Sequence, residues 1–164
     1  MKLYDELVKS NKKSAAVDII LSGNNFFMIP RGRSVNGNWY GLQYLDYLVT
    51  NNKNQLFDIK FIDKVLNAID VSINYDRKNI DKNEKLQEIV SNFILRGEGV
   101  RRISINLDVR KPNSLFIYKF VQSSSGDFSA NPNDAIIIDD NSNEKEFLEA
   151  ISTQLGLNKI NTRK

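Results

Sequence analysis

Residues 102–121 read RISINLDVRKPNSLFIYKFV, and this stretch decides the fold class. Its first half alternates apolar and polar residues, which is typical of a β-strand with one buried face. Its second half, from residue 115, is apolar at almost every position, so we expect a strand in the sheet interior. Pro112-Asn113 marks a turn between the two halves. The stretch therefore predicts a β-hairpin over residues 101–121.

The length of the connecting loop predicts which residues face each other in this hairpin. A four-residue loop over 110–113 sets the following pairs: Leu107 with Phe116, Ile105 with Tyr118, and Ile103 with Phe120. The aliphatic residues of one strand would then share a buried face with the aromatic rings of the other.

Shorter segments on either side of the hairpin supply the rest of the fold. Residues 26–29 and 135–138 are predicted strands, the first ended by Pro30, and residues 31–38 are a predicted loop. Segments 14–21 and 57–61 fit either a helix or a strand. Apolar spacing predicts helices over residues 2–10, 39–49, 57–69 and 81–94 and a last helix that runs through Leu155, with Asn141-x-x-Glu144 capping it.

The expected fold class is therefore α+β, with a small, mostly antiparallel sheet packed against about four to five helices. The hairpin 101–121 and the short strands would form this sheet. Residues 1–164 are expected to form a single domain. Within it we expect a flexible loop at 123–134 and a frayed tail at 158–164.

Composition excludes several kinds of chemistry. The chain has 164 residues, 41% hydrophobic and 26% charged, as in a globular domain. It contains no Cys and no His, which removes disulfides, thiol nucleophiles, imidazole or thiolate metal sites, and Ser-His or Cys-His catalytic pairs. The sequence therefore predicts a protein that is not an enzyme, with no cofactor and no metal site. No apolar run is long enough to span a membrane, so we expect folding in the cytoplasm of a bacterial host.

Two alternative functions start from charged residues. Asp139 and Asp140 follow a predicted strand, as carboxylates that hold Mg²⁺ in a nuclease can, although they also suit the start of the last helix. Basic residues near the hairpin, beside its three alternating aromatic residues, could serve a nucleic-acid-binding or host-inhibiting phage or plasmid protein: Arg96, Arg101, Arg102, Arg110 and Lys111. Alternating aromatic residues in a hairpin are more often core, and the net charge of +3 is mild for a nucleic-acid binder.

The order of these elements resembles the acidic baseplate wedge family of contractile phage tails, also called the sheath-initiator or lysozyme-like tail family. Arg31-Gly32-Arg33 matches the loop of that family that is rich in Arg and Gly, and Tyr40-Gly41 matches its aromatic-Gly step. ISINLDV and SLFIYKF match its strand hairpin. The resemblance implies a non-enzymatic structural or assembly protein of a phage particle, present in the host cytoplasm and then in the virion.

The resemblance also implies where partner subunits would bind. Members of the family offer sheet edges to which a neighbouring subunit adds a strand, and residues 102–109 are the expected edge. Arg31, Arg33 and Glu98 would contact the wedge. The tyrosine stripe of 39–49 suits a protein interface from its residue types alone. The expected partner-binding residues are Arg31, Arg33, Tyr40, Tyr44, Tyr47, Glu98, Arg101, Arg102, Ser104, Asn106 and Asp108.

Overall fold

The computed structural model describes residues 14–22, 25–33, 39–41, 59–74, 100–108, 110–111, 113–125 and 128–157. The predicted helices at 2–10 and 81–94 and the predicted tail at 158–164 lie outside these residues. Among the described residues no helix is long and apolar enough to cross a membrane.

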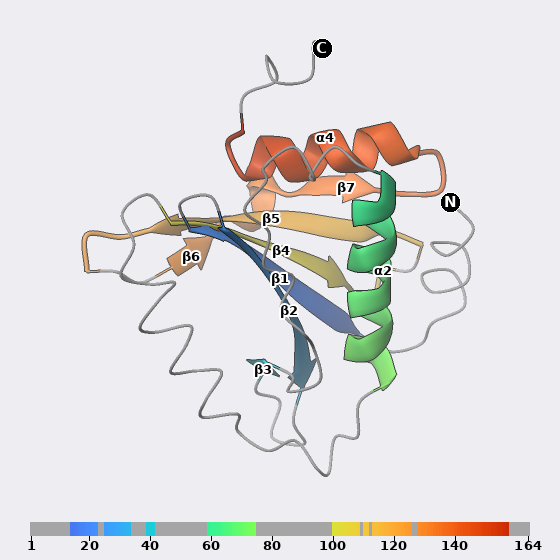
Figure 1. Ribbon diagram of the computed structural model, residues 1–164, viewed down its shortest axis with the longest axis horizontal. Helices are drawn as coiled ribbons and strands as arrows, with labels where there is room; N and C mark the ends of the chain where they lie inside the picture. The colour runs from blue at the N-terminus through green and yellow to red at the C-terminus, as the bar shows by residue number, and fades with distance from the viewer. Residues whose placement is uncertain are drawn as a thin grey trace.

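The centre of the structure is one antiparallel sheet (Figure 1). Six strands lie in the order β3-β2-β1-β4-β5-β6, and a seventh, β7, also pairs with β5. Their bounds are β1 Ala15–Ser22, β2 Asn25–Arg33, β3 Trp39–Gly41, β4 Arg101–Leu107, β5 Leu115–Gln122, β6 Phe128–Ala130 and β7 Ile136–Ile138. The sequence left residues 14–21 open between helix and strand, and they form β1. The predicted strand at 135–138 is confirmed as β7.

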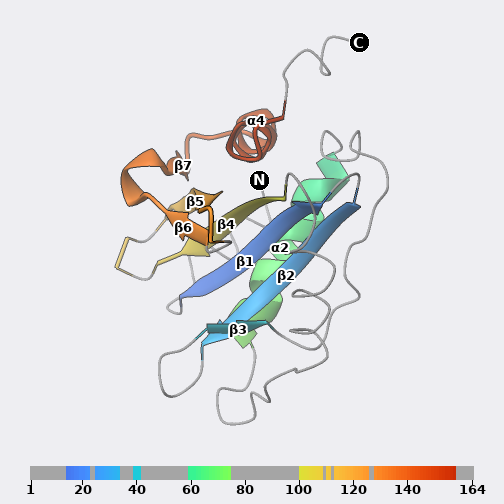
Figure 2. The same ribbon diagram turned by 90° about the vertical axis from the view of Figure 1, so that its left-hand side faces the viewer.

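Two α-helices, α2 (Ile59–Asn74) and α4 (Glu144–Gln154), pack on one face of this sheet, as Figure 2 shows from the side. Alternate strand residues point toward them, among them Val17, Ile19, Ile103 and Ile105, all fully buried. The helices contribute apolar residues at helical spacing, so that strands and helices share one core. Each such side chain stabilises the fold by about 1.5–3 kcal/mol.

The helix count departs from the prediction. The described residues hold two α-helices and a short 3₁₀ helix, so four to five helices are not supported. The ambiguous segment at 57–61 is helical from residue 59 onward. Asn143, rather than Asn141, caps α4, since its side chain accepts a hydrogen bond from the Glu146 amide at 2.9 Å.

The hairpin itself is confirmed, but its predicted register is wrong by one residue. Leu107 faces Leu115, Ile105 faces Ile117 and Ile103 faces Lys119. The connection spans 108–114 rather than 110–113. Asp108 starts it by accepting a hydrogen bond from the Lys111 amide at 2.9 Å, and Asn113 takes a positive φ of 69°. This longer turn keeps the aliphatic residues of both strands together under the helices.

The one-residue shift moves the aromatic row to the other face of the sheet. Phe116, Tyr118 and Phe120 lie opposite Asn106, Ser104 and Arg102 instead of the three aliphatic residues of β4. We call this side of the sheet, which points away from α2 and α4, the opposite face. Side chains that the sequence placed in the core therefore lie beside the polar residues of β4.

β4 is not the edge strand that the resemblance implied. It pairs along its length with β1 on one side and with β5 on the other. Its backbone donors and acceptors are therefore used within the sheet and cannot accept a strand from a partner. The alternation of apolar and polar residues could not reveal this, because a half-buried strand shows the same alternation at the edge of a sheet and in its interior.

Two predictions near residues 30–41 are also wrong. β2 continues through Pro30 to Arg33, so residues 31–33 are strand rather than loop. Proline is tolerated there because β3 pairs with β2 only from Arg31 onward. Residues 39–41 form β3 instead of starting a helix, because pairing with β2 outweighs the apolar spacing. Residues 42–49 lie outside the described residues.

The predicted loop at 123–134 contains regular structure. β6 pairs with the end of β5 at residues 120–122, and Pro132–Asp134 forms the 3₁₀ helix. Asn131 caps that helix by accepting a hydrogen bond from the Asn133 amide at 3.0 Å. The flexibility of the segment stays a prediction.

Candidate functional site

The opposite face of the sheet is hollowed into an open groove of about 540 Å³. The first residues of β1, the middle of β4 and the aromatic side of β5 line it, together with Arg31 from β2. We call it the arginine groove. Its functional groups are carried by Arg31, Arg102, Arg110, Ser104, Tyr118 and Phe120.

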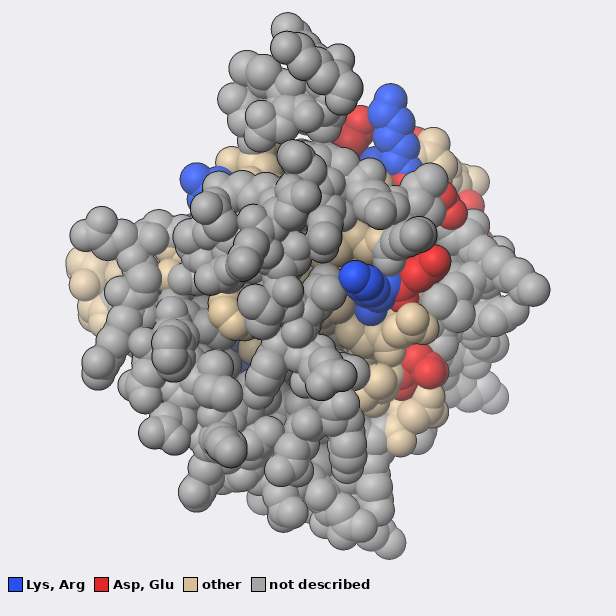
Figure 3. Space-filling view, in the orientation of Figure 1, with Lys and Arg blue, Asp and Glu red and all other residues tan. Residues whose placement is uncertain are grey.

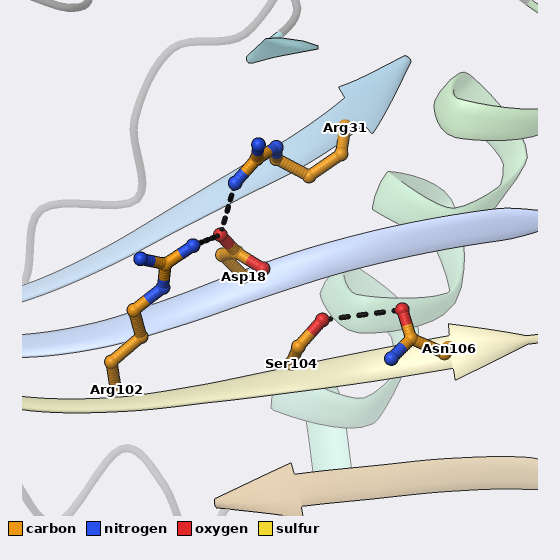
Figure 4. A network of polar contacts seen from close by, with 5 residues as sticks. All are labelled: Asp18, Arg31, Arg102, Ser104 and Asn106. Carbon is orange, nitrogen blue, oxygen red and sulfur yellow. Dashed lines mark hydrogen bonds and ion pairs between the residues drawn. The ribbon is translucent and has the colours of Figure 1, made fainter. Parts of the chain in front are cut away.

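A shared carboxylate holds two of these arginines. Asp18 lies in β1 between β2 and β4, and its Oδ2 accepts hydrogen bonds from Arg31 Nη1 and Arg102 Nη2, both at 2.7 Å (Figure 4). The Asp18 side chain is only 5% exposed, while the two arginine side chains keep 25% and 21% exposure. A buried carboxylate with two guanidinium partners is well compensated, and it fixes both cations on the sheet.

Aromatic rings hold Arg102 from another direction. Its guanidinium carbon lies 4.6 Å from the centroid of the Phe120 ring and 5.6 Å from that of Phe128. Both distances suit a cation–π interaction. The Arg102 Nε is buried, and no acceptor for it exists among the described residues. Arg102 is therefore positioned by an ion pair and two rings, and its Nε–H group is left without an acceptor in the described part of the chain.

A second ion pair lies at the mouth of the groove. Arg110 binds Asp108 through its side chain, with Nη2 at 2.9 Å from Oδ2, and also through its backbone amide at 2.9 Å. These hydrogen bonds hold the pKa of Asp108 below its ordinary value of 3.8. The Arg110 side chain is 85% exposed, so the guanidinium remains accessible from solvent.

A serine of helix α2 binds the backbone of the two strands that carry Ala16 and Arg31. Ser72, fully buried, accepts a hydrogen bond from the Ala16 amide at 3.0 Å and donates to the Arg31 carbonyl at 2.5 Å. Its hydroxyl thus lies between two residues that face each other in the β1–β2 ladder. The strand position that carries Arg31 is thereby tied to the helix behind it.

The two helices carry more acidic than basic residues. α2 and α4 together contain five acidic residues and three lysines. Figure 3 views the molecule from the side of Figure 1, where acidic and basic side chains both appear over the position of α2. The groove, in contrast, combines three arginines with Asp18 and Asp108, which leaves one net positive charge.

Five of the predicted partner-binding residues meet in the groove: Arg31, Arg102, Ser104, Asn106 and Asp108. Within it, Ser104 Oγ donates to Asn106 Oδ1 at 3.2 Å, on the same side of β4 as Arg102 (Figure 4). The sequence grouped the residues of β4 by their alternation. It assigned them to a sheet edge, whereas the structure places them on a sheet face.

The other predicted site residues lie elsewhere. Arg101 points to the helix side, where Nη1 donates to the carbonyls of Leu155 and Gly156 at 3.1 and 2.8 Å and so caps α4. For Arg33 and Tyr40 the structure describes the backbone, in β2 and β3. Tyr44, Tyr47 and Glu98 lie outside the described residues.

Sequence reasoning missed Asp18 and Ser72. Asp18 is the single charged residue in the apolar segment AAVDIIL, a signal that could have identified it, because a charge buried in a strand requires partners. Ser72 had no signal, because a serine on a helix gives no indication that a strand lies against it. The sequence placed Tyr118 and Phe120 in the hairpin core, with nucleic-acid binding as the alternative, and named Arg110 only for that alternative.

Asp139, proposed as a metal ligand, takes part in the turn before α4. Its Oδ1 accepts hydrogen bonds from the Asn141 amide at 2.9 Å and the Ser142 hydroxyl at 3.4 Å. Among the described residues, no group of three or more acidic side chains is arranged to hold a metal ion.

Comparison with known proteins relates the fold to two solved structures. No protein-family model matches the sequence, and no curated protein matches it. The fold is similar to a protein of unknown function from Neisseria meningitidis, with a TM-score of 0.67 and 10% identity over 90% of this chain and 96% of the other. It is also similar to a chain in the CdiA-CT/CdiI toxin and immunity complex from Yersinia pseudotuberculosis, with a TM-score of 0.65 and 10% identity over 88% and 97%.

These similarities overturn the resemblance to the baseplate wedge family. Both solved structures match nearly the whole chain, and one of them is a chain of a toxin and immunity complex. The interior position of β4 removes the sheet edge on which the earlier resemblance depended. The short motifs that carried it, an Arg-Gly-Arg segment and a strand hairpin, occur in many unrelated folds.

Proposed function

We propose that this chain is a non-enzymatic protein that binds and blocks a toxin, as one partner of a toxin–immunity pair. The observation that carries the proposal is the fold similarity to a chain of the Yersinia pseudotuberculosis complex over almost the full length of both chains. The absence of His and Cys from the sequence supports a binding rather than a catalytic role, since both side chains are common in catalysis near neutral pH. The phage-tail version of the assembly hypothesis depended on the overturned resemblance and is not retained.

The arginine groove supports the same proposal. Interfaces are enriched in Arg and Tyr, and binding energy concentrates on such side chains when they are held in place before binding. Arg31 and Arg102 are held by Asp18, and Arg102 also by two rings. A partner therefore meets side chains that lose little conformational entropy on binding.

Co-expression in bacteria tests the proposal. The chain is produced alone, each product of the genes that flank it is produced alone, and the pairs are produced together. We expect the chain alone to leave growth unchanged, one flanking product to arrest growth, and the pair to restore growth and co-purify. Growth arrest by this chain itself, or no rescue by it of any toxic neighbour, would contradict the proposal.

A second candidate function, binding of single-stranded nucleic acid, is favoured by one observation. Arg102 lies against Phe120 and Phe128, with Tyr118 on the same side of β5, a combination that stacks bases in other proteins. Retention on single-stranded DNA or RNA that falls steeply with salt would support it, because phosphate binding releases counterions. Retention that does not depend on salt or on Arg102 would exclude it.

A further inference from the structure

We propose that the arginine groove binds an acidic segment of the partner protein, with one carboxylate at Arg31 and Arg102, another at Arg110, and the segment's backbone along Tyr118 and Phe120. The existence of a protein partner rests on the proposed function. The chemistry of the segment is inferred here from the groove itself.

The guanidinium groups of Arg31 and Arg102 are fixed in place before any ligand binds. Asp18 accepts one hydrogen bond from each of Arg31 and Arg102 through a single oxygen. A guanidinium carries five N–H donors, and within the described part of the chain Arg102 donates one hydrogen bond, to Asp18. Its buried Nε has no acceptor among the described residues. An incoming carboxylate can supply acceptors in the fork geometry that guanidinium groups prefer.

The described residues of the groove carry a positive charge balance. Among them three arginines lie with two aspartates, a formal balance of one positive charge at neutral pH. One or two carboxylates neutralise such a site. This positive balance favours an acidic ligand, and the proposed function, which requires a protein partner, favours an acidic protein segment over a nucleic acid.

The shape of the groove suits an extended segment. A groove of about 540 Å³ that is open along one side accommodates several residues of an extended chain. Phe116 and Tyr118 lie with ring centroids 6.3 Å apart and nearly parallel, which continues the aromatic wall along β5. Aromatic rings and guanidinium groups lie side by side in the groove, which suits a segment that carries both apolar and acidic side chains.

Nuclear magnetic resonance on the full ¹⁵N-labelled chain tests the inference without knowledge of the partner. The probes are a hexaglutamate peptide, a hexalysine peptide and a thymidine hexanucleotide. We expect hexaglutamate to shift the amide resonances of residues 102–108 and 118–120, with a millimolar dissociation constant, and hexalysine to shift none of them. Absence of hexaglutamate binding, or shifts confined to other elements, would overturn the inference. Tighter binding of the hexanucleotide at the same residues would reassign the groove to phosphate.

Matched charge reversals separate the groove from net charge. Arg110→Glu and Lys145→Glu each lower the formal net charge from +3 by two, the first in the groove and the second on exposed α4. We expect Arg110→Glu to weaken hexaglutamate binding about tenfold and Lys145→Glu to change it less than about twofold. Equal effects of the two variants would overturn the inference.

Arg102→Gln adds a variant at the inner end of the groove. It removes one guanidinium and leaves the contact between Asp18 and Arg31 in place. We expect about tenfold weaker hexaglutamate binding. If thermal unfolding shows that this variant is not folded, the result for Arg110→Glu decides, because that side chain is 85% exposed.

The inference and the proposed function can fail separately. Hexaglutamate binding in the groove, without any protein that the chain rescues or captures, would remove the proposed function alone. A partner complex whose affinity is unchanged by Arg110→Glu and Arg102→Gln would remove the inference alone.

Discussion

Asp18 and Arg102 form an ion pair at 2.7 Å between β1 and β4, although 84 positions separate them in the sequence. The same carboxylate oxygen binds Arg31 from β2 on the other side. Three adjacent strands therefore meet in one polar contact on the face of the sheet away from the helices. This contact, the hydrogen bonds of Ser72 to the strand backbone and the register of the hairpin can each be tested by substitution.

Replacing Asp18 by Asn is expected to destabilise the fold. The variant leaves two guanidinium groups close together without their shared anion. We expect a loss of about 2 kcal/mol in the free energy of unfolding, less than for a fully buried pair because both arginines are partly exposed. Chemical denaturation followed by circular dichroism measures it. Asp63→Asn, on the exposed side of α2, is the control and should change stability by less than about 0.5 kcal/mol.

Two buried serines should respond differently to replacement by alanine. Ser72 bridges the Ala16 amide and the Arg31 carbonyl, and its loss leaves both groups without that partner. Ser72→Ala is expected to cost about 1–3 kcal/mol. Ser152 on α4 is also buried, but its hydroxyl has no partner among the described residues. Ser152→Ala should leave the free energy of unfolding, measured by chemical denaturation, unchanged or raise it. An equal loss of stability in both variants would contradict the role of Ser72.

The ion pair at the mouth of the groove should be visible in the titration of Asp108. Hydrogen bonds from the Arg110 side chain and amide hold the Asp108 pKa below 3.8 in the folded protein. The pair therefore contributes stability at pH values above 3.8, and the contribution is lost as the pH falls through the folded pKa. Arg110→Gln should raise the Asp108 titration midpoint, measured by the carboxyl ¹³C shift, toward 3.8. An unchanged midpoint would show that Arg110 does not act on this carboxyl group.

Introduced cysteine pairs can test the register of the hairpin, because the natural chain has no cysteine. Ser104 faces Tyr118 in the structure, whereas the register predicted from the sequence places it opposite Lys119. Ser104→Cys with Tyr118→Cys should therefore form a disulfide under mild oxidation. Ser104→Cys with Lys119→Cys should not, because those side chains point to opposite faces. Mass spectrometry of non-reduced peptides distinguishes the two results, and the reverse pattern would refute the register.

By itself the sequence determined the local elements whose pattern is strong. The alternation over residues 102–109 and the apolar run from residue 115 predicted the hairpin. The apolar spacing of residues 57–69 and 147–155 predicted the two helices of the core. These predictions succeeded because solvent exposure imposes a period of two on strands and 3.6 on helices.

Only the tertiary structure decided which strands are neighbours and which face each side chain takes. The connection between the hairpin strands spans 108–114 and is not centred on the predicted loop 110–113. This shifts the register by one residue and moves Phe116, Tyr118 and Phe120 to the opposite face. The contact of Asp18 with Arg31 and Arg102 depends on β1 lying between β2 and β4. Such contacts between distant residues arise from strand order, and the period of a single strand contains no information about its neighbours.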